Sequence, residues 1–95
     1  MNTANLQMEG MLLALAALCE TLKRNSVLSH DQIAEALVCA ETGVSSRAPG
    51  LSDANVDAIR FPIRFLQQAL LRDGEALDYA SIASDVGRDR DKSHS

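Results

Sequence analysis

The first quarter of the chain carries the clearest helical pattern in the sequence. Apolar residues recur at steps of three and four between residues 5 and 25, which is the period of one helix face. They are Met8, Met11, Leu12, Leu15, Leu18, Cys19 and Leu22. On a helical wheel all of them lie within about 60° of Leu15, so we expect this side of the helix to face the core.

The opposite side of this helix is also largely apolar. Leu6 and Leu13 point away from Leu15, and small apolar residues flank them. A helix that is apolar nearly all round is normally buried on more than one side. Because a chain of 95 residues has few other helices to cover the second side, we expect a second subunit to cover it. The predicted dimer interface consists of Leu6, Met8, Leu13, Ala16 and Ala17.

A second helix is predicted from Ser29 to about residue 42. Ser29 and Gln32 have the spacing of a capping box, in which each side chain bonds to the other residue's backbone. Gly43 is a natural left-handed end for such a helix. Because the connection to the first helix is short, we expect the two helices to form an antiparallel hairpin. The predicted inward residues are Ile33, Ala36, Leu37 and Ala40.

A long third helix is predicted over residues 52–72, with Pro62 inside it. Ser52 is a preferred N-cap residue, and Leu51 and Val56 have the spacing of a hydrophobic staple. A proline in a helix interior removes one backbone hydrogen bond and clashes one turn back. We therefore expect either a kink just before Pro62 or two helices placed end to end.

The end of the chain predicts a short helix over residues 75–86, closed by Gly87, with Gly74 closing the helix before it. Its predicted inward residues are Tyr79, Ile82, Ala83 and Val86. Residues 88–95 contain no apolar residue, and we expect a disordered polar tail there. The whole pattern predicts a single all-α domain, residues 1–87, with four or five helices: an antiparallel hairpin, a Pro-kinked long helix and a short C-terminal helix.

Composition and charge narrow the classes of function. Ala and Leu dominate the apolar residues, which favours helix over sheet. The net charge of −4 opposes binding to nucleic acid, whose affinity for proteins comes from Lys and Arg. The longest apolar run, Met11 to Cys19, is far shorter than the roughly 20 residues that span a bilayer. We therefore expect neither a nucleic-acid nor a membrane partner, and a cytoplasmic location.

Candidate catalytic residues are few. His30 begins the second helix, where an imidazole is usually a solvated side chain, and His94 lies in the polar tail. No phosphate-binding loop, dinucleotide fingerprint or zinc-protease motif is present in the sequence. We therefore expect a protein that is not an enzyme, with no catalytic residue, no metal site and no cofactor.

Two cysteines need a separate interpretation. Cys19 and Cys39 lack the C-x-x-C spacing and nearby histidines of a zinc site. We interpret Cys19 as a buried small hydrophobic residue and Cys39 as a partly buried one. A redox role, or a thiol contact between two subunits, is the alternative.

These patterns lead to one main hypothesis about function. The chain is interpreted as a non-enzymatic helical module for protein–protein interaction, either a homodimeric adaptor or a small regulatory or accessory subunit. Its expected partner is a second copy of itself, with another protein as a further partner.

Two alternatives remain open. A small-molecule- or metal-binding module would use a cavity beneath the proline bend, lined by Cys19, Phe61 and Phe65. A DNA-associated regulator would need an exposed helix with basic residues on one side. Those residues would be Arg60, Arg64 and Arg72.

Overall fold

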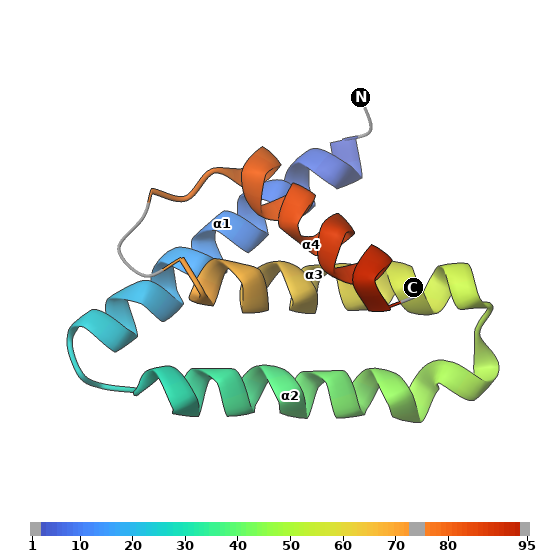
Figure 1. Cartoon of the computed structure of the whole chain (residues 1–95), viewed down its shortest axis with the longest axis horizontal. Helices are drawn as coiled ribbons and strands as arrows, with labels where there is room; N and C mark the ends of the chain where they lie inside the picture. The colour runs from blue at the N-terminus through green and yellow to red at the C-terminus, as the bar shows by residue number, and fades with distance from the viewer. Residues whose placement is uncertain (1–2, 73–75, 94–95) are drawn as a thin grey trace.

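The computed structural model describes residues 3–72 and 76–93, and all regular structure in these ranges is helical (Figure 1). Its elements are α1 (Thr3–Arg24), α2 (His30–Arg47), the 3₁₀ turn η1 (Ala48–Gly50), α3 (Asp53–Leu70) and α4 (Tyr79–Ser93). The predicted all-α fold is confirmed, with four α-helices in the described part of the chain.

Helix α3 is the central element, because α1, α2 and α4 all pack on it. In Figure 1, α1 runs obliquely towards one end of α3, while α2 and α3 run antiparallel and are joined through η1. The prediction that the first two helices pack together as a hairpin is therefore wrong. Helix α2 packs on α3 instead, and α1 and α2 diverge from their short connection.

The connection between α1 and α2 explains this divergence. Ser26 has a positive φ of 59°, and the Val27 amide bonds back to the Leu22 carbonyl at 2.9 Å. The Ser26 amide bonds to the Lys23 carbonyl at 3.0 Å. These bonds are those of a Schellman motif, with Ser26 at the left-handed position. The motif ends α1 and sets the direction in which the chain leaves it.

The core lies where α1, α3 and α4 meet. Phe65 of α3 and Ile82 of α4 are fully buried. Phe65 also stacks on Tyr79, with ring centroids 5.0 Å apart, and contacts Phe61 at 6.2 Å with tilted rings. The buried cluster consists of Leu12, Ala16, Phe65, Ala69, Ile82 and Val86.

The inward side of α1 differs from the prediction. Leu12 and Ala16 are buried, whereas the predicted centre of the inward side, Leu15, is 46% exposed. The side that faces the core is therefore rotated by about 80° from Leu15. Ala16 is small, and so is Ala69 of α3 in the same cluster. A small side chain at a helix contact permits a short distance between the axes, which favours this side of α1.

The start of α2 is confirmed in detail. The Ser29 amide donates to the Gln32 Oε1 at 2.8 Å, and the Gln32 amide donates to the Ser29 Oγ at 3.1 Å. Of the predicted inward residues, Ile33 is buried and Leu37 half-buried. The predictions for Ala36 and Ala40 are wrong, because both are exposed. Helix α2 meets α3 along one flank, so only part of its apolar side is covered.

The predicted end of α2 at Gly43 is wrong. The helix continues to Arg47, and Gly43 is an ordinary helical residue. Val44, one residue later, is buried. Glycine inside a helix costs about 1 kcal/mol relative to alanine. Burial of a valine contributes about 1.5–3 kcal/mol, so the extension of the helix is favourable.

Helix α3 passes through Pro62 without a break. Its N-cap is confirmed, since the Ser52 Oγ accepts a bond from the Asn55 amide at 3.2 Å. The structure shows one helix over residues 53–70, not two placed end to end. The kink before Pro62 stays a prediction. Gly74, the predicted end of this helix, lies outside the described residues.

The inward side of α4 is confirmed, with Ile82 and Val86 buried. Its predicted limits are wrong. It begins at Tyr79 and passes Gly87 to end at Ser93, so residues 88–93 are helical where we expected a disordered tail. An ion pair one turn apart, Asp85 with Arg88, spans Gly87 and supports the extra turn. Residues 94–95, with His94, lie outside the described residues.

The position of Gly43 inside α2 leads to a test. Gly43→Ala should raise the free energy of unfolding by about 0.5–1 kcal/mol, because a Cβ at this position meets no atom within 4 Å. If Gly43 instead adopted a left-handed conformation, the same change would destabilise the protein. Urea unfolding followed by circular dichroism measures the difference. Ala40→Gly, at an exposed position of the same helix, is the matched control and should lower the stability.

Candidate functional site

The five residues of the predicted dimer interface differ in how far they are buried within the chain. Ala16 is buried, and Met8 and Leu13 pack against the same core. Leu6, which is 48% exposed, and Ala17 stay at the surface. Ala16 therefore has little surface left for a partner, Met8 and Leu13 are partly covered by their own chain, and the interface of all five residues stays a prediction. Self-association itself stays a prediction.

A different side of α1 carries the exposed apolar residues. Met11, Leu15 and Leu18 are 62%, 46% and 58% exposed, and their spacing places them in one row. The exposed residues of α1 between Glu9 and Arg24 include no charged side chain. We call these residues the α1 outer face: Gly10, Met11, Ala14, Leu15, Ala17, Leu18 and Thr21.

The α1 outer face has two parallel rows. Large side chains form one row, described above. Small side chains form the other, at the same helical spacing: Gly10, Ala14, Ala17 and Thr21. Small residues let a neighbouring helix approach closely, and large ones supply apolar area. The face therefore carries a row of large side chains beside a row of small ones.

Two charged residues in the last turns of α1 lie away from the outer face. Glu20 and Lys23 are half-buried and form an ion pair at 3.5 Å. Each is within about 60° of the Leu12–Ala16 side on the helical wheel. These two charges therefore lie off the outer face, whereas Arg24 at the end of α1 donates to the Thr21 Oγ1 at 3.5 Å and borders the face there.

Two of the three arginines that a DNA-binding surface would need take part in ion pairs. The Arg72 guanidinium donates to the Ser81 Oγ at 2.7 Å and to the Asp85 Oδ2 at 2.5 Å. Arg60 lies 3.6 Å from the Glu41 carboxylate of α2. Among the described residues, these contacts fasten helices to one another, so Arg60 and Arg72 do not form an exposed basic row with Arg64.

The acidic partner in this cluster has a shifted pKa. Hydrogen bonds from Arg72, and then from Arg88, hold the pKa of Asp85 below its usual value of 3.8, although burial opposes the shift. Arg72 follows α3, and Asp85 lies on α4. The pair therefore holds the segment just after α3 against α4.

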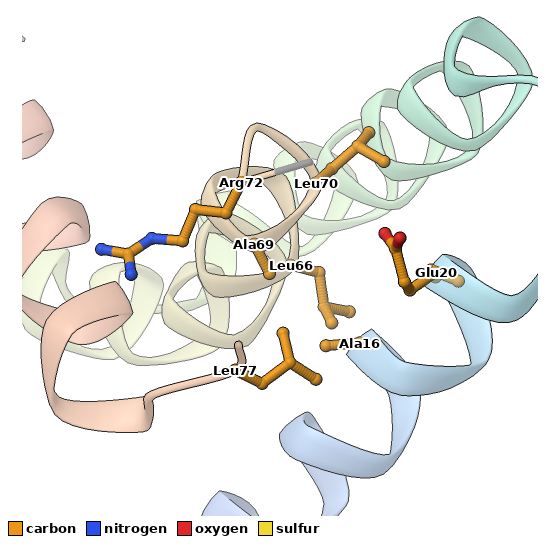
Figure 2. Close-up of a pocket in the computed structure, with 8 residues that line it drawn as sticks. Ala16, Glu20, Leu66, Ala69, Leu70, Arg72 and Leu77 are labelled. Carbon is orange, nitrogen blue, oxygen red and sulfur yellow. The ribbon is translucent and has the colours of Figure 1, made fainter. Parts of the chain in front are cut away.

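The cavity predicted beneath the proline bend is not formed by its predicted residues. Phe65 is fully buried in the core. Cys19 lines a pocket of about 20 Å³ between α1, α3 and the segment before α4 (Figure 2). That volume holds little more than one water molecule. In Figure 2, Arg72 points away from this pocket towards α4.

Phe61 lines two other depressions instead. One of about 140 Å³ lies between α3 and α4. The larger one, about 340 Å³, lies between the start of α1, the middle of α3 and the first residue of α4. We call the larger one the aromatic groove. Its lining residues are Asn5, Leu6, Met8, Glu9, Phe61 and Tyr79.

The thiols and the described histidine lie apart from these features. Cys19 is half-buried, and burial raises the pKa of its thiol, which lowers its reactivity. Cys39 is exposed, so the prediction of partial burial is wrong. His30 is exposed at the first turn of α2. No group of three metal-binding side chains occurs within residues 3–72 and 76–93. No helix in these ranges is long and apolar enough to cross a membrane.

The Asp85 cluster predicts a specific acid dependence. A folded-state pKa below the usual value means that Asp85 stabilises the fold fully above about pH 4. This contribution is lost as the pH falls from 3.8 through the lower folded-state pKa. Asp85→Asn should therefore reduce stability at neutral pH and flatten the loss of stability below pH 4. Glu35→Gln, at an exposed site on α2, should change neither.

Thermal unfolding of both variants over a pH series measures these effects. An acid dependence of Asp85→Asn equal to that of the unmodified protein would contradict the assignment.

The surface of the chain is the basis for assigning its function. The chain matches no protein-family model, no curated protein and no solved structure. Two features stand out on the surface of the described residues: the α1 outer face and the aromatic groove.

Proposed function

We propose that this protein is a non-enzymatic helical interaction module that forms a homodimer through the α1 outer face. Its role is that of an adaptor or a small regulatory or accessory subunit. One observation carries the proposal: Met11, Leu15 and Leu18 stand in one row on α1, each about half exposed, with no exposed charge beside them.

The energy available from this row supports association. Full burial of such a side chain contributes about 1.5–3 kcal/mol, so the half still exposed on each is worth about 1 kcal/mol. A two-fold dimer buries the row in both copies. No charged side chain of the face loses its hydration in the process, which removes a large cost of association.

The shape of the face supports a second copy as the partner. A two-fold axis parallel to α1 places the large row of each copy opposite the small row of the other. Leu15 of one copy then lies over Ala14 and its small neighbours in the partner. A surface that matches itself in this way needs no other protein to cover it.

The same proposal includes a reducing, cytoplasmic environment. Cys19 and Cys39 are both free thiols in the structure. Proteins of oxidising compartments commonly use paired cysteines to stabilise domains of this size. The fold here depends on apolar packing and on ion pairs instead.

Leu15→Glu should dissociate the dimer without unfolding the chain. The new charge lies at the centre of the proposed interface, while the side chain it replaces is already 46% exposed in the single chain. Sedimentation equilibrium at micromolar concentration should give twice the 10.2 kDa chain mass for the unmodified protein and one chain mass for the variant. Far-ultraviolet circular dichroism should stay unchanged.

Two further variants serve as controls. Val38→Glu changes an apolar residue of α2 that is 58% exposed, and it should leave the dimer intact. Leu13→Glu directs a charge at the core and should lower the stability of the fold itself. A monomer at every concentration of the unmodified protein, or equal dissociation by Val38→Glu, would contradict the proposed interface.

A further inference from the structure

The aromatic groove has the size of a small-molecule site. Its volume of about 340 Å³ lies at the lower end of the range of about 300–1,000 Å³ for ligand pockets. Three helices contribute to it, α1, α3 and α4. Of the residues of the α1 outer face, none lines the groove, so a ligand and a second copy of the chain can bind independently.

Two aromatic rings form part of its wall. Phe65 stacks on Tyr79 with the ring planes 29° apart and so covers one face of the tyrosine. Phe61 is tilted by 52° from Phe65. Because Phe65 is fully buried, both rings are held from behind by the core. Two rings set at different angles by one buried neighbour make a rigid, concave aromatic wall.

The charge on the groove is negative. Glu9 is the one charged side chain among its lining residues, and it is half-buried. Within the described part of the chain, the side chain of Glu9 forms no hydrogen bond and no ion pair. Its carboxylate lies close enough to Tyr79 to raise the pKa of the phenol, after the larger effect of burial. The groove thus combines aromatic rings with a carboxylate that lacks a cationic partner.

This combination selects the chemistry of a ligand. Aromatic faces attract cations, most strongly the weakly hydrated methylated ammonium ions. An anion would be repelled by Glu9, and a neutral apolar molecule would strip water from its charge without replacing it. A calcium or magnesium ion prefers six or more oxygen ligands, which the six mainly apolar lining residues do not offer.

We propose that the aromatic groove binds a small organic cation with a methylated ammonium head group. Phe61 and Tyr79 contact the methyl groups, and the Glu9 carboxylate neutralises the charge. Leu6 and Met8 cover the apolar body of the ligand. This site is separate from the dimer interface and does not depend on it.

Choline and 3,3-dimethyl-1-butanol are a matched pair of probes, because carbon replaces the quaternary nitrogen in the second. The chain has a single tyrosine and no tryptophan, so its intrinsic fluorescence reports on Tyr79 alone. Titration should show saturable binding of choline that is at least about tenfold tighter than that of the neutral alcohol. Chemical-shift changes in nuclear magnetic resonance should map to the lining residues.

Two variants test the assigned roles. Glu9→Gln should weaken choline binding by about tenfold but should not weaken binding of the alcohol, which no longer has to desolvate a carboxylate. Phe61→Leu, which keeps an apolar side chain and loses the ring, should also weaken choline binding. Glu35→Gln, an exposed glutamate on α2, should bind choline as the unmodified protein does. Equal affinities for choline and the alcohol, or an unchanged affinity in Glu9→Gln, would overturn the proposal.

A ligand-free measurement tests the geometry on which the site depends. The absorbance of ionised tyrosine gives the pKa of Tyr79 directly. Glu9→Gln should lower this pKa towards its usual value, because the nearby negative charge is removed. An unchanged pKa would show that Glu9 does not face Tyr79 and would overturn the site even without a binding experiment. Neither result depends on whether the chain dimerises.

Discussion

Phe65 lies where α1, α3 and α4 meet, and its burial organises the rest of the molecule. The ring is fully buried and stacks on Tyr79 at the start of α4. Helix α1 turns Leu12 and Ala16 towards the same cluster. Because the Leu12–Ala16 side of α1 faces this core, the side that carries Met11, Leu15 and Leu18 stays exposed. The exposed face of α1 is thus a direct consequence of how Phe65 is covered.

Ion pairs determine how the other helices meet this core. Arg72 and Asp85 join the end of α3 to α4, and Arg60 and Glu41 join α3 to α2. These pairs are only partly exposed, so salt screens them less than it screens fully exposed pairs. They also use basic side chains that a binding site for phosphate would need. Among the described residues, these charged side chains therefore connect helices to one another.

Helix α1 presents three different environments around its circumference. One side is buried on α3 and α4, another is the uncharged outer face, and the first two turns form one wall of the aromatic groove. The outer face is the proposed contact with a second copy of the chain, and the groove is the proposed site for a small positive ligand. The outer face and the groove have no residue in common.

Local sequence signals determined much of this protein by themselves. The caps at Ser29 and Ser52 depend on hydrogen bonds within a few residues, and both are present as predicted. The inward side of α4 was also predictable, because Ile82 and Val86 stand among polar neighbours. The glycines at positions 43 and 87 indicated helix ends, but both helices continue past them. Burial of Val44 supports the extension of α2, and the ion pair of Asp85 with Arg88 supports that of α4.

Tertiary structure alone decided which side of α1 faces inward and which helix pairs with α2. The sequence of α1 is rich in Ala and Leu all round, and its periodicity pointed to the Leu15 side, about 80° from the side that is buried. The choice of the buried side depends on shape. Ala16 of α1 packs in the same core as Phe65 and Ala69 of α3, which lie roughly 50 positions later in the chain. The aromatic groove has the same origin, because Glu9, Phe61 and Tyr79 come from three helices. Contacts between such distant residues depend on how whole helices fit together, and no local pattern encodes that fit.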